Sequence, residues 1–273
     1  MARRIQVIGI GAGNPDHMTI EAIKALNACD VLFIPTKGDE KSFLAELRQT
    51  ICDTFIAEKR PRQFRFVLPE RHRGHDYPQA IETWYSAVAE TYQRLFLEEM
   101  APEQTAGILV WGDPMLYDGT IRILNIVRNS GKVAFDFDVI PGITSLQALC
   151  ARHRIPLNRV GGAVQITTGR RLAAGWPEGI DDIAVMLDEG QAYETIDDPS
   201  AEILWGAYVG TPMEILISGR LMDVAPDISR ARKAARTEHG WIMDAYIIRR
   251  RPHASQPDWH RAAFSDSPSE TQA

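Results

Sequence analysis

Apolar positions follow two alternating rhythms along the first half of the chain. Short apolar runs rich in Val, Ile and Phe predict strands near 4–9, 30–34, 63–67, 107–111 and 135–140. Between these runs, apolar residues recur every three or four positions, which predicts helices near 19–28, 41–53, 77–98 and 118–130. Regular alternation of strands and helices is typical of a mostly parallel sheet covered by helices on both faces.

The second half of the chain has a different pattern. Pro141-Gly142 interrupts the alternation, so we place a boundary there, between an N-terminal α/β domain (1–141) and a mixed α/β domain (142–251). Further strands are predicted near 163–168, 182–187, 202–209, 214–219 and 241–249, with helices at 143–152 and 226–238. The strands at 202–209 and 214–219 are close enough to form an antiparallel pair. Residues 252–273 are rich in Pro, Ser, Asp and Glu and predict a disordered tail.

Two glycine-rich turns follow predicted strands, a first turn at 9–19 and a second turn at 112–120. Ligands of parallel sheets bind at the carboxyl ends of strands, so the turns are candidates for a binding site. The first turn is not a dinucleotide-binding fingerprint, because Asn14 replaces the third glycine and Pro15 interrupts the turn. We therefore expect the following helix to begin near Thr19, as its N-cap. A tight connection without any ligand is the alternative.

Composition narrows the class of protein. The chain has 273 residues, of which 45% are hydrophobic and 24% are charged, as in an ordinary soluble globular protein. No apolar run approaches the roughly 20 residues of a membrane span, and the N-terminus is interpreted as a first strand, not a signal peptide. Cys29, Cys52 and Cys150 are odd in number and widely spaced, so we expect no disulfide framework, no zinc site and a cytoplasmic location. The net charge of −6 argues against nucleic-acid binding.

Two basic stretches stand out against this acidic balance, at 58–76 and at 226–238. Each is either a solvated surface or a binding surface for an anionic substrate. The second alternative is open because the guanidinium of arginine binds carboxylates well. We find no catalytic triad, P-loop or metal-ligand spacing. Backbone at the glycines of the turns, at Gly142 and at Gly210 is expected to be exposed, which suits a reaction whose cofactor carries the reactive group.

Three motifs in order resemble those of the tetrapyrrole methylases. They are Gly-x-Gly-x-Gly-x-Pro-x-x-Met-Thr at 9–19, Gly-Asp-Pro-x-x-Tyr at 112–117 and Pro-Gly-Ile-Thr-Ser at 141–145. Gly210-Thr211-Pro212 resembles a fourth element, and the resemblance covers about residues 5–250. It implies two α/β domains with S-adenosylmethionine (SAM) in the cleft between them, a tetrapyrrole substrate, a homodimer, and neither nucleic acid nor membrane as a partner.

The resemblance also implies cofactor-binding roles, residue by residue. Gly11 and Pro15 would pack against the cofactor, and Thr144 and Ser145 would bond its polar groups at a helix N-terminus. Four residues of the second turn would meet its methionine part: Gly112, Asp113, Pro114 and Tyr117. Four residues of the second half would hold adenine: Leu187, Tyr208, Val209 and Gly210. Each could instead be a plain turn glycine, packing proline or N-cap threonine.

Within the family, three regions resemble one branch: the form of the second turn, the segment 58–85 and the region 205–210. That branch methylates C-1 of precorrin-5 in cobalamin biosynthesis and releases acetate to give precorrin-6A. Asn14 departs from the usual Asp, and the glycine run after the second motif is reduced.

The branch implies a need for proton transfer during deacetylation and for cations that bind substrate carboxylates. Our candidates for proton transfer are Lys37, Asp39 and Glu40, and those for the carboxylates are Arg62, Arg71 and Arg73. Two alternatives stay open. One is another superfamily methylase acting on a different corrin precursor, RNA ribose or a diphthamide precursor. The other is an inactive protein that binds SAM or carries a tetrapyrrole.

Overall fold

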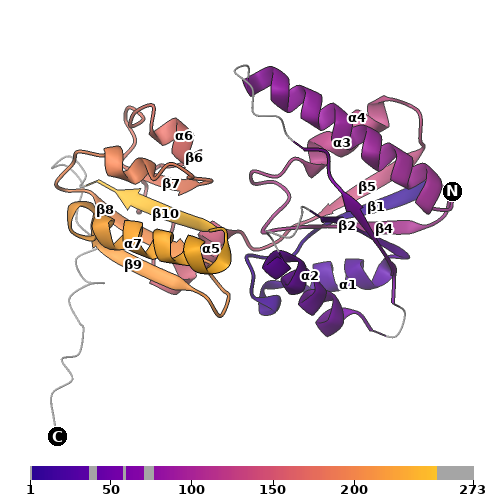
Figure 1. The fold of residues 1–273 in the computed structure, drawn as a ribbon, viewed down its shortest axis with the longest axis horizontal. Coiled ribbons are helices and arrows are strands. Elements are labelled where there is room, and N and C mark those ends of the chain that lie inside the picture. Colours follow the sequence, from indigo (N-terminus) through magenta and orange to yellow (C-terminus); the bar gives the residue numbers. More distant parts are fainter. Residues whose placement is uncertain (1, 37–41, 58–59, 71–76, 251–273) are drawn as a thin grey trace, which may run out of the picture.

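A computed structural model describes residues 2–36, 42–57, 60–70 and 77–250 (Figure 1). The predicted tail and the candidates Lys37, Asp39, Glu40, Arg71 and Arg73 lie outside the described residues.

Five parallel strands form the first sheet, in the order β3-β2-β4-β1-β5. The strands are β1 (Arg3–Gly9), β2 (Val31–Thr36), β3 (Arg62–Val67), β4 (Thr105–Val110) and β5 (Phe135–Ile140). The helices between them are α1 (Ile20–Ala28), α2 (Ser42–Phe55), α3 (Tyr77–Glu99) and α4 (Thr120–Asn129). The predicted parallel α/β arrangement is confirmed for this part of the chain.

Helices cover both faces of this sheet, α3 and α4 on one side and α1 and α2 on the other (Figure 1). Because side chains alternate along a strand, neighbouring residues serve different cores. Phe33 packs with Tyr92 and Phe96 of α3, whereas Leu32 packs with Leu26 of α1. Full burial of one such side chain stabilises the fold by about 1.5–3 kcal/mol.

Local signals set the ends of the first connection. Thr19 caps α1, its Oγ1 accepting a hydrogen bond from Ala22 N at 3.0 Å, which confirms the predicted start of the helix. Ahead of it, Pro15 begins a single 3-10 turn, η1 (Pro15–His17). The Oδ1 of Asn14 accepts a hydrogen bond from Asp16 N at 3.0 Å. An amide oxygen makes this bond as a carboxylate would, which gives a structural reason why Asn can stand at this position.

The second sheet is mixed and has the order β6-β7-β10-β8-β9. Its strands are β6 (Val164–Thr168), β7 (Asp182–Met186), β8 (Glu202–Ala207), β9 (Ile215–Arg220) and β10 (Asp244–Arg249). Only β6 and β7 pair in parallel; β8 and β9 form the antiparallel pair that the sequence predicts. The last strand, β10, is inserted between β7 and β8 and is antiparallel to both. As a result, β6, β7 and β8 run in one direction and end at the same edge.

Helices also cover the second sheet. α5 (Ser145–His153) packs on β8 and β10, whereas α7 (Leu221–His239) lies against β8 and β9. Two short helical turns, α6 (Gly169–Leu172) and η3 (Ala192–Thr195), complete this half. α7 begins five residues before the predicted start at 226, since Leu221 is already buried and its N–H bonds to Ala201 O at 2.8 Å. The boundary between residues 141 and 142 stays a prediction.

The two sheets meet through loops from their strand ends. Ala12 of the first turn and Leu116 of the second turn join an apolar cluster built on α5 and the second sheet, which includes Leu149 and Val209. Among the described residues, no helix is long and apolar enough to cross a bilayer.

Candidate active site

The first and second turns are joined by their backbones. Gly11 N donates to Gly112 O at 3.2 Å, and Gly112 N donates to Gly11 O at 2.8 Å. This pair of bonds extends the contact of β1 with β4 beyond the end of the sheet. The two turns therefore form one rigid unit at the carboxyl edge of the first sheet.

Asp113 attaches a third loop, at 141–145, to this unit. Its carboxylate is largely buried and accepts hydrogen bonds from Met115 N at 2.7 Å and from Gly142 N at 2.8 Å. The approach is so close that a Cβ on Gly142 would lie 2.1 Å from Gly112 O. Asp113 thus positions two loops.

A fourth loop, at 208–212, reaches the first turn from the other half of the chain. A Cβ on Gly210 would lie 2.9 Å from Cε1 of His17, and one on Gly13 would lie 2.6 Å from Cγ2 of Thr211. Gly210 N donates to Oε2 of Glu214 at 2.9 Å. Loops from both sheets therefore converge, which is the arrangement that a site shared by the two halves requires.

One expectation about these loops is wrong. The N–H groups of Gly11, Gly112, Gly142 and Gly210 are not available to a ligand, because each already has the acceptor described above. Gly142 is needed because backbone approaches it closely, whereas Gly11, Gly112 and Gly210 have the positive φ that favours glycine.

Thr144 is the N-cap of α5, within a complete capping box. Its Oγ1 accepts a hydrogen bond from Gln147 N at 3.2 Å, and Gln147 Oε1 accepts one from Thr144 N at 2.8 Å. The hydroxyl oxygen serves as the helix cap, which leaves its O–H as a donor, so a cofactor contact by Thr144 stays a prediction. Ser145, the first residue of the helix, is half-buried.

The predicted cofactor residues differ in exposure. Leu187 is 62% exposed and Tyr117 is 44% exposed. Pro15, Gly112 and Gly210 are half-buried, whereas Gly11, Pro114 and Val209 are buried. The side chain of Tyr208 is fully buried, and its hydroxyl donates to Trp241 O at 2.5 Å. The Tyr208 side chain thus belongs to the core, and adenine binding by the stretch at 208–210 stays a prediction.

Left-handed backbone is concentrated at these loops. Tyr117, Leu187 and Tyr208 have φ of 54°, 54° and 49°. A left-handed conformation costs a non-glycine residue about 1–2 kcal/mol, so it persists only where the surroundings enforce it. Such strain is common at ligand sites, and three residues predicted from motifs share it.

A buried hydrogen-bond network enforces the conformation beside Leu187. The carboxylate of Asp188 accepts hydrogen bonds from Tyr246 Oη and Ala192 N, both at 2.7 Å, and from Gly190 N at 3.1 Å. Arg232 donates to Asp188 O at 2.7 Å and forms an ion pair with Asp244. Nothing in the local sequence pattern indicated this network.

The motif analysis also missed two residues at the junction. Met115 of the second turn is 74% exposed, a large apolar side chain beside Asp113. His17 lies between Gly11 and Gly210, and its Nδ1 is buried without a partner among the described residues. Burial lowers the pKa of His17, against the opposing effect of the Asp16 and Glu214 carboxylates. Both residues stand inside the family motifs, next to residues that we named as cofactor-binding candidates. This position in the sequence is the signal that could have identified them.

Arg62 does not reach these loops. It is the first residue of β3 and pairs in register with Val31 at the amino end of β2. Its guanidinium forms an ion pair with Glu99 at 2.7 Å. At about 3.3 Å per residue, Arg62 lies roughly 17 Å from the carboxyl end of β3. The structure contradicts a substrate contact by Arg62 at this site.

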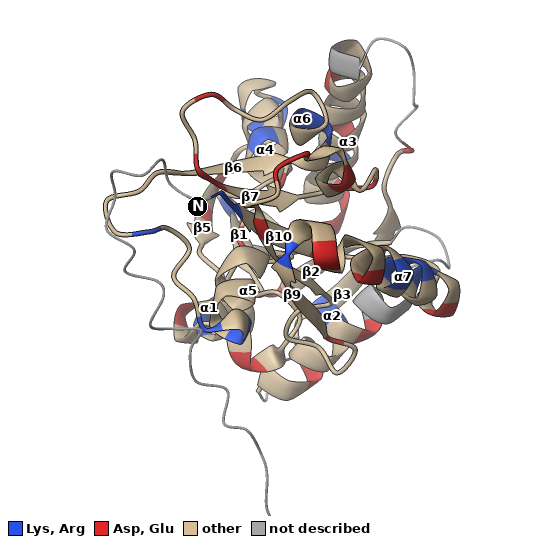
Figure 2. Cartoon of the chain, turned by 90° about the vertical axis from the view of Figure 1, so that its left-hand side faces the viewer, with Lys and Arg blue, Asp and Glu red and all other residues tan. Residues whose placement is uncertain are grey.

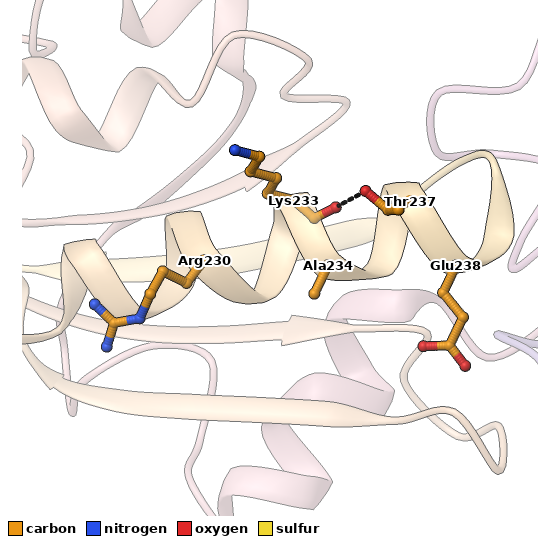
Figure 3. Close-up of a pocket in the computed structure, with 5 residues that line it drawn as sticks. All are labelled: Arg230, Lys233, Ala234, Thr237 and Glu238. Carbon is orange, nitrogen blue, oxygen red and sulfur yellow. Dashed lines mark hydrogen bonds between the residues drawn. The ribbon is translucent and has the colours of Figure 1, made fainter.

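The second basic stretch divides between core and surface. Arg232 is buried in the network described above. Arg230 and Lys233 instead line a shallow pocket on the outer side of α7, with Thr237 and Glu238 (Figure 3). Basic and acidic segments are interspersed over the helices, α7 included, in the view of Figure 2. The mixed charges favour the solvated-surface interpretation.

The fold and the converging loops define a class of protein, and comparison with known proteins identifies it. The model of the Tetrapyrrole (Corrin/Porphyrin) Methylases matches residues 4–225. The chain belongs to this family, so it is an enzyme of the methyltransferase class, and the predicted family and fold are confirmed.

Particular relatives refine this assignment. Precorrin-6A synthase [deacetylating] from Sinorhizobium sp is 54% identical over 249 residues, which are 91% of this chain and 95% of the relative. The crystal structure of a protein described as related to cobalamin synthesis (CobF) from Corynebacterium diphtheriae is 34% identical. It matches with a TM-score of 0.80 over 92% of this chain and 99% of that chain. Uroporphyrin-III C-methyl transferase from Thermus thermophilus, solved with S-adenyl homocysteine, shares the fold at 18% identity and a TM-score of 0.54 over 90% of this chain and 96% of that chain.

Proposed function

We propose that this chain is a SAM-dependent C-methyltransferase of cobalamin biosynthesis that methylates C-1 of precorrin-5 and releases acetate, giving precorrin-6A. The observation that carries the proposal is the convergence of the first turn, the second turn and the loop at 208–212 at the junction of the two sheets. The 54% identity to a precorrin-6A synthase supports this substrate over another corrin precursor.

The junction fits SAM in its apolar character. Met115 and Tyr117 of the second turn are 74% and 44% exposed, and Leu187, which directly follows β7, is 62% exposed. Exposed apolar groups beside a few fixed polar groups are typical of sites for small cofactors. We propose that Leu187 and the backbone at 208–210 hold adenine, and that Pro15, Tyr117 and the loop at 112–114 enclose the methionine part. Gly11, Asp113 and Thr144 would act by fixing the loops.

Methyl transfer to carbon requires little acid–base chemistry from the protein. When bound, SAM supplies a methyl group on a sulfonium, which is already a good electrophile. The residues of the chain then have to align the two reactants and exclude water, and alignment alone can contribute a large part of the rate. The rigid unit formed by the first two turns serves this purpose, because Asp113 fixes it to the loop at 141–145.

Release of acetate additionally consumes a water molecule and needs proton transfer. Lys37, Asp39 and Glu40 remain our candidates, because in the chain they follow Thr36, the last residue of β2. This position is the carboxyl end of a parallel strand, the edge at which the converging turns lie.

The reaction can be tested by product analysis. Incubation of the protein with precorrin-5 and isotopically labelled SAM should give labelled precorrin-6A and one acetate per methyl group transferred, as measured by mass spectrometry. Methylation without acetate would assign the protein to a different step. Labelling of RNA or of a protein histidine would favour the other branches of the superfamily.

The site can be tested separately by Asp113→Ala. Loss of both hydrogen bonds should weaken SAM binding about tenfold in calorimetry, in line with about 1.5 kcal/mol for hydrogen bonds to a charged group. Asp113→Asn keeps an acceptor oxygen and should fall between Asp113→Ala and the wild type. Unchanged SAM affinity in Asp113→Ala would contradict the proposed site.

We further propose a homodimer that works in the cytoplasm. The family resemblance supports the dimer, and the three free, buried cysteines suit a reducing compartment. Analytical ultracentrifugation should give twice the chain mass; a monomer would contradict the dimer.

A further inference from the structure

Arg48 of α2 has no ion pair with any described residue, and it lies next to the second turn. Its guanidinium stacks on Trp111, with Cζ 5.1 Å from the ring centroid, and Trp111 directly precedes Gly112. Its Nε is buried and has no hydrogen-bond partner among the residues that the structure describes. Burial lowers the pKa of the guanidinium, and Asp118 is among the groups that oppose this effect.

Arg159 and Arg250 also have a buried guanidinium nitrogen without a hydrogen-bond partner among the described residues, but three other covered arginines differ from Arg48 in having a carboxylate partner. Arg232 pairs with Asp244, Arg159 pairs with Asp182 at 3.0 Å, and Arg250 pairs with Asp198 at 2.8 Å. No ion pair or hydrogen bond of this kind joins Arg48 to a described residue. The carboxylate of Asp118 instead accepts a hydrogen bond from Thr120 N at 2.7 Å. Keeping a desolvated charge unpaired destabilises a protein, so such a group is a candidate for a functional role.

The position of Arg48 relates it to the proposed site. Its neighbour Leu47 approaches the first turn, where a Cβ on Gly13 would lie 4.0 Å from Leu47 Cδ1. On the other side, Trp111 directly precedes the second turn and Asp118 lies within it. Arg48 is half-buried, so the guanidinium remains within reach of a ligand at the carboxyl edge of the first sheet.

We propose that Arg48 binds a carboxylate of the tetrapyrrole substrate; this inference rests on the proposed function. The planar guanidinium presents parallel donors that match a carboxylate, and stacking on Trp111 fixes its plane before the substrate arrives. The covered environment strengthens the pairing because water competes less for the charge. Arg48 therefore takes the role that Arg62, at the opposite edge of the sheet, cannot have.

Arg48→Met tests the proposal, because methionine fills similar space without charge. We expect the KM for precorrin-5 to rise about ten- to hundredfold, the KM for SAM to stay within twofold, and the Tm of the ligand-free protein to stay equal or rise. Arg48→Lys keeps the charge but loses the planar pair of donors, so its KM for precorrin-5 should lie between those of the wild type and Arg48→Met. A Tm lowered by several degrees with an unchanged KM for precorrin-5 would show a structural role and overturn the proposal.

The matched control is Arg128→Met. Arg128 is exposed on α4 and also stacks on an aromatic ring, with Cζ 5.3 Å from the centroid of Phe137. It lies outside the proposed site, so both KM values should equal those of the wild type. A similar rise in the KM for precorrin-5 would overturn a specific role for Arg48.

A binding measurement separates this inference from the proposed function. Uroporphyrin, a stable octacarboxylate tetrapyrrole, should raise the Tm of the wild type and of Arg128→Met but not that of Arg48→Met. If the wild type makes no precorrin-6A but shows this pattern, the proposed reaction fails and the anion site stands. If the wild type makes precorrin-6A, and uroporphyrin raises the Tm of Arg48→Met as much as that of the wild type, the proposed reaction stands and this inference fails.

Discussion

The two halves of the molecule meet the same conformational requirement in different ways. The first half places glycines where the backbone is left-handed, with φ of 80° at Gly11 and 64° at Gly112. The second half places Leu187 and Tyr208 in the same region, with φ of 54° and 49°. Glycine adopts this conformation without strain, whereas the other two residues need the surrounding structure to enforce it.

The choice between glycine and a larger residue follows from the surroundings of each loop. At Gly9 and Gly142 in the first half, backbone packs so closely against backbone that a Cβ would not fit, and at Gly11 a Cβ would lie 2.5 Å from Cβ of His17. The left-handed positions in the loops of the second half carry large side chains. Leu187 is 62% exposed, whereas Tyr208 is packed in the core. The first half is therefore shaped by the absence of side chains, and the second by the buried network around Asp188.

The largest effect should come from adding a side chain where the backbones of two loops approach each other most closely. In Gly142→Ala the added Cβ would lie 2.1 Å from Gly112 O, and backbone cannot move aside as a flexible side chain does. We expect a loss of about 3 kcal/mol in the free energy of unfolding, the upper range for overpacking, together with loss of SAM binding. Urea denaturation and calorimetry measure the two effects.

Gly131→Ala is the control for that substitution. Gly131 has a φ of 67° but nothing within 4 Å of an added Cβ, so this change isolates backbone strain at about 1–2 kcal/mol. Equal losses in the two variants would mean that close approach of the strand ends is not what requires glycine.

A smaller effect should come from weakening the network of the second half. Tyr246→Phe removes the hydroxyl that donates to Asp188 at 2.7 Å, and Ala192 N and Gly190 N still donate. We expect a loss of about 1–2 kcal/mol in stability and severalfold weaker SAM binding, because Leu187 is held less firmly.

The comparison variant is Tyr193→Phe. Its hydroxyl donates to Gln191 at 3.0 Å and does not contact Asp188. Stability should fall similarly while SAM affinity is kept. Weaker SAM binding in both variants would mean that the whole core of this half, and not Asp188, controls the loop.

The smallest effect should come from placing glycine at a left-handed position of the second half, as the first half does. Leu187→Gly relieves the left-handed strain and should raise stability by about 1 kcal/mol, while loss of the apolar side chain weakens SAM binding severalfold. Arg154→Gly serves as the control, since Arg154 has a φ of 57° at the end of α5. It should gain similar stability with SAM affinity unchanged; a gain in Arg154→Gly but not in Leu187→Gly would mean that Leu187 is not strained.

Part of the site could be read from local sequence, because its signals are local. The Thr19 cap and the antiparallel pair of β8 and β9 depend on residues close together in the sequence, and the strands and helices of the first half are each indicated by a short local pattern. The order of the motifs also identified the family. The placement of β10 between β7 and β8 depends on pairing across distant segments, and no local pattern indicated it.

The elements, the class of protein and the turns that need glycine could be inferred from side-chain period, capping and motif order. How those turns are used depends on contacts between distant parts of the chain. The fold pairs the N–H groups of Gly112 and Gly142 within the chain, buries Arg232 and Tyr208, and stacks Arg48 on Trp111 without an ion pair to any described residue. The physical reason is that a polar group's partner is set by which distant residues the fold brings within about 3 Å of it.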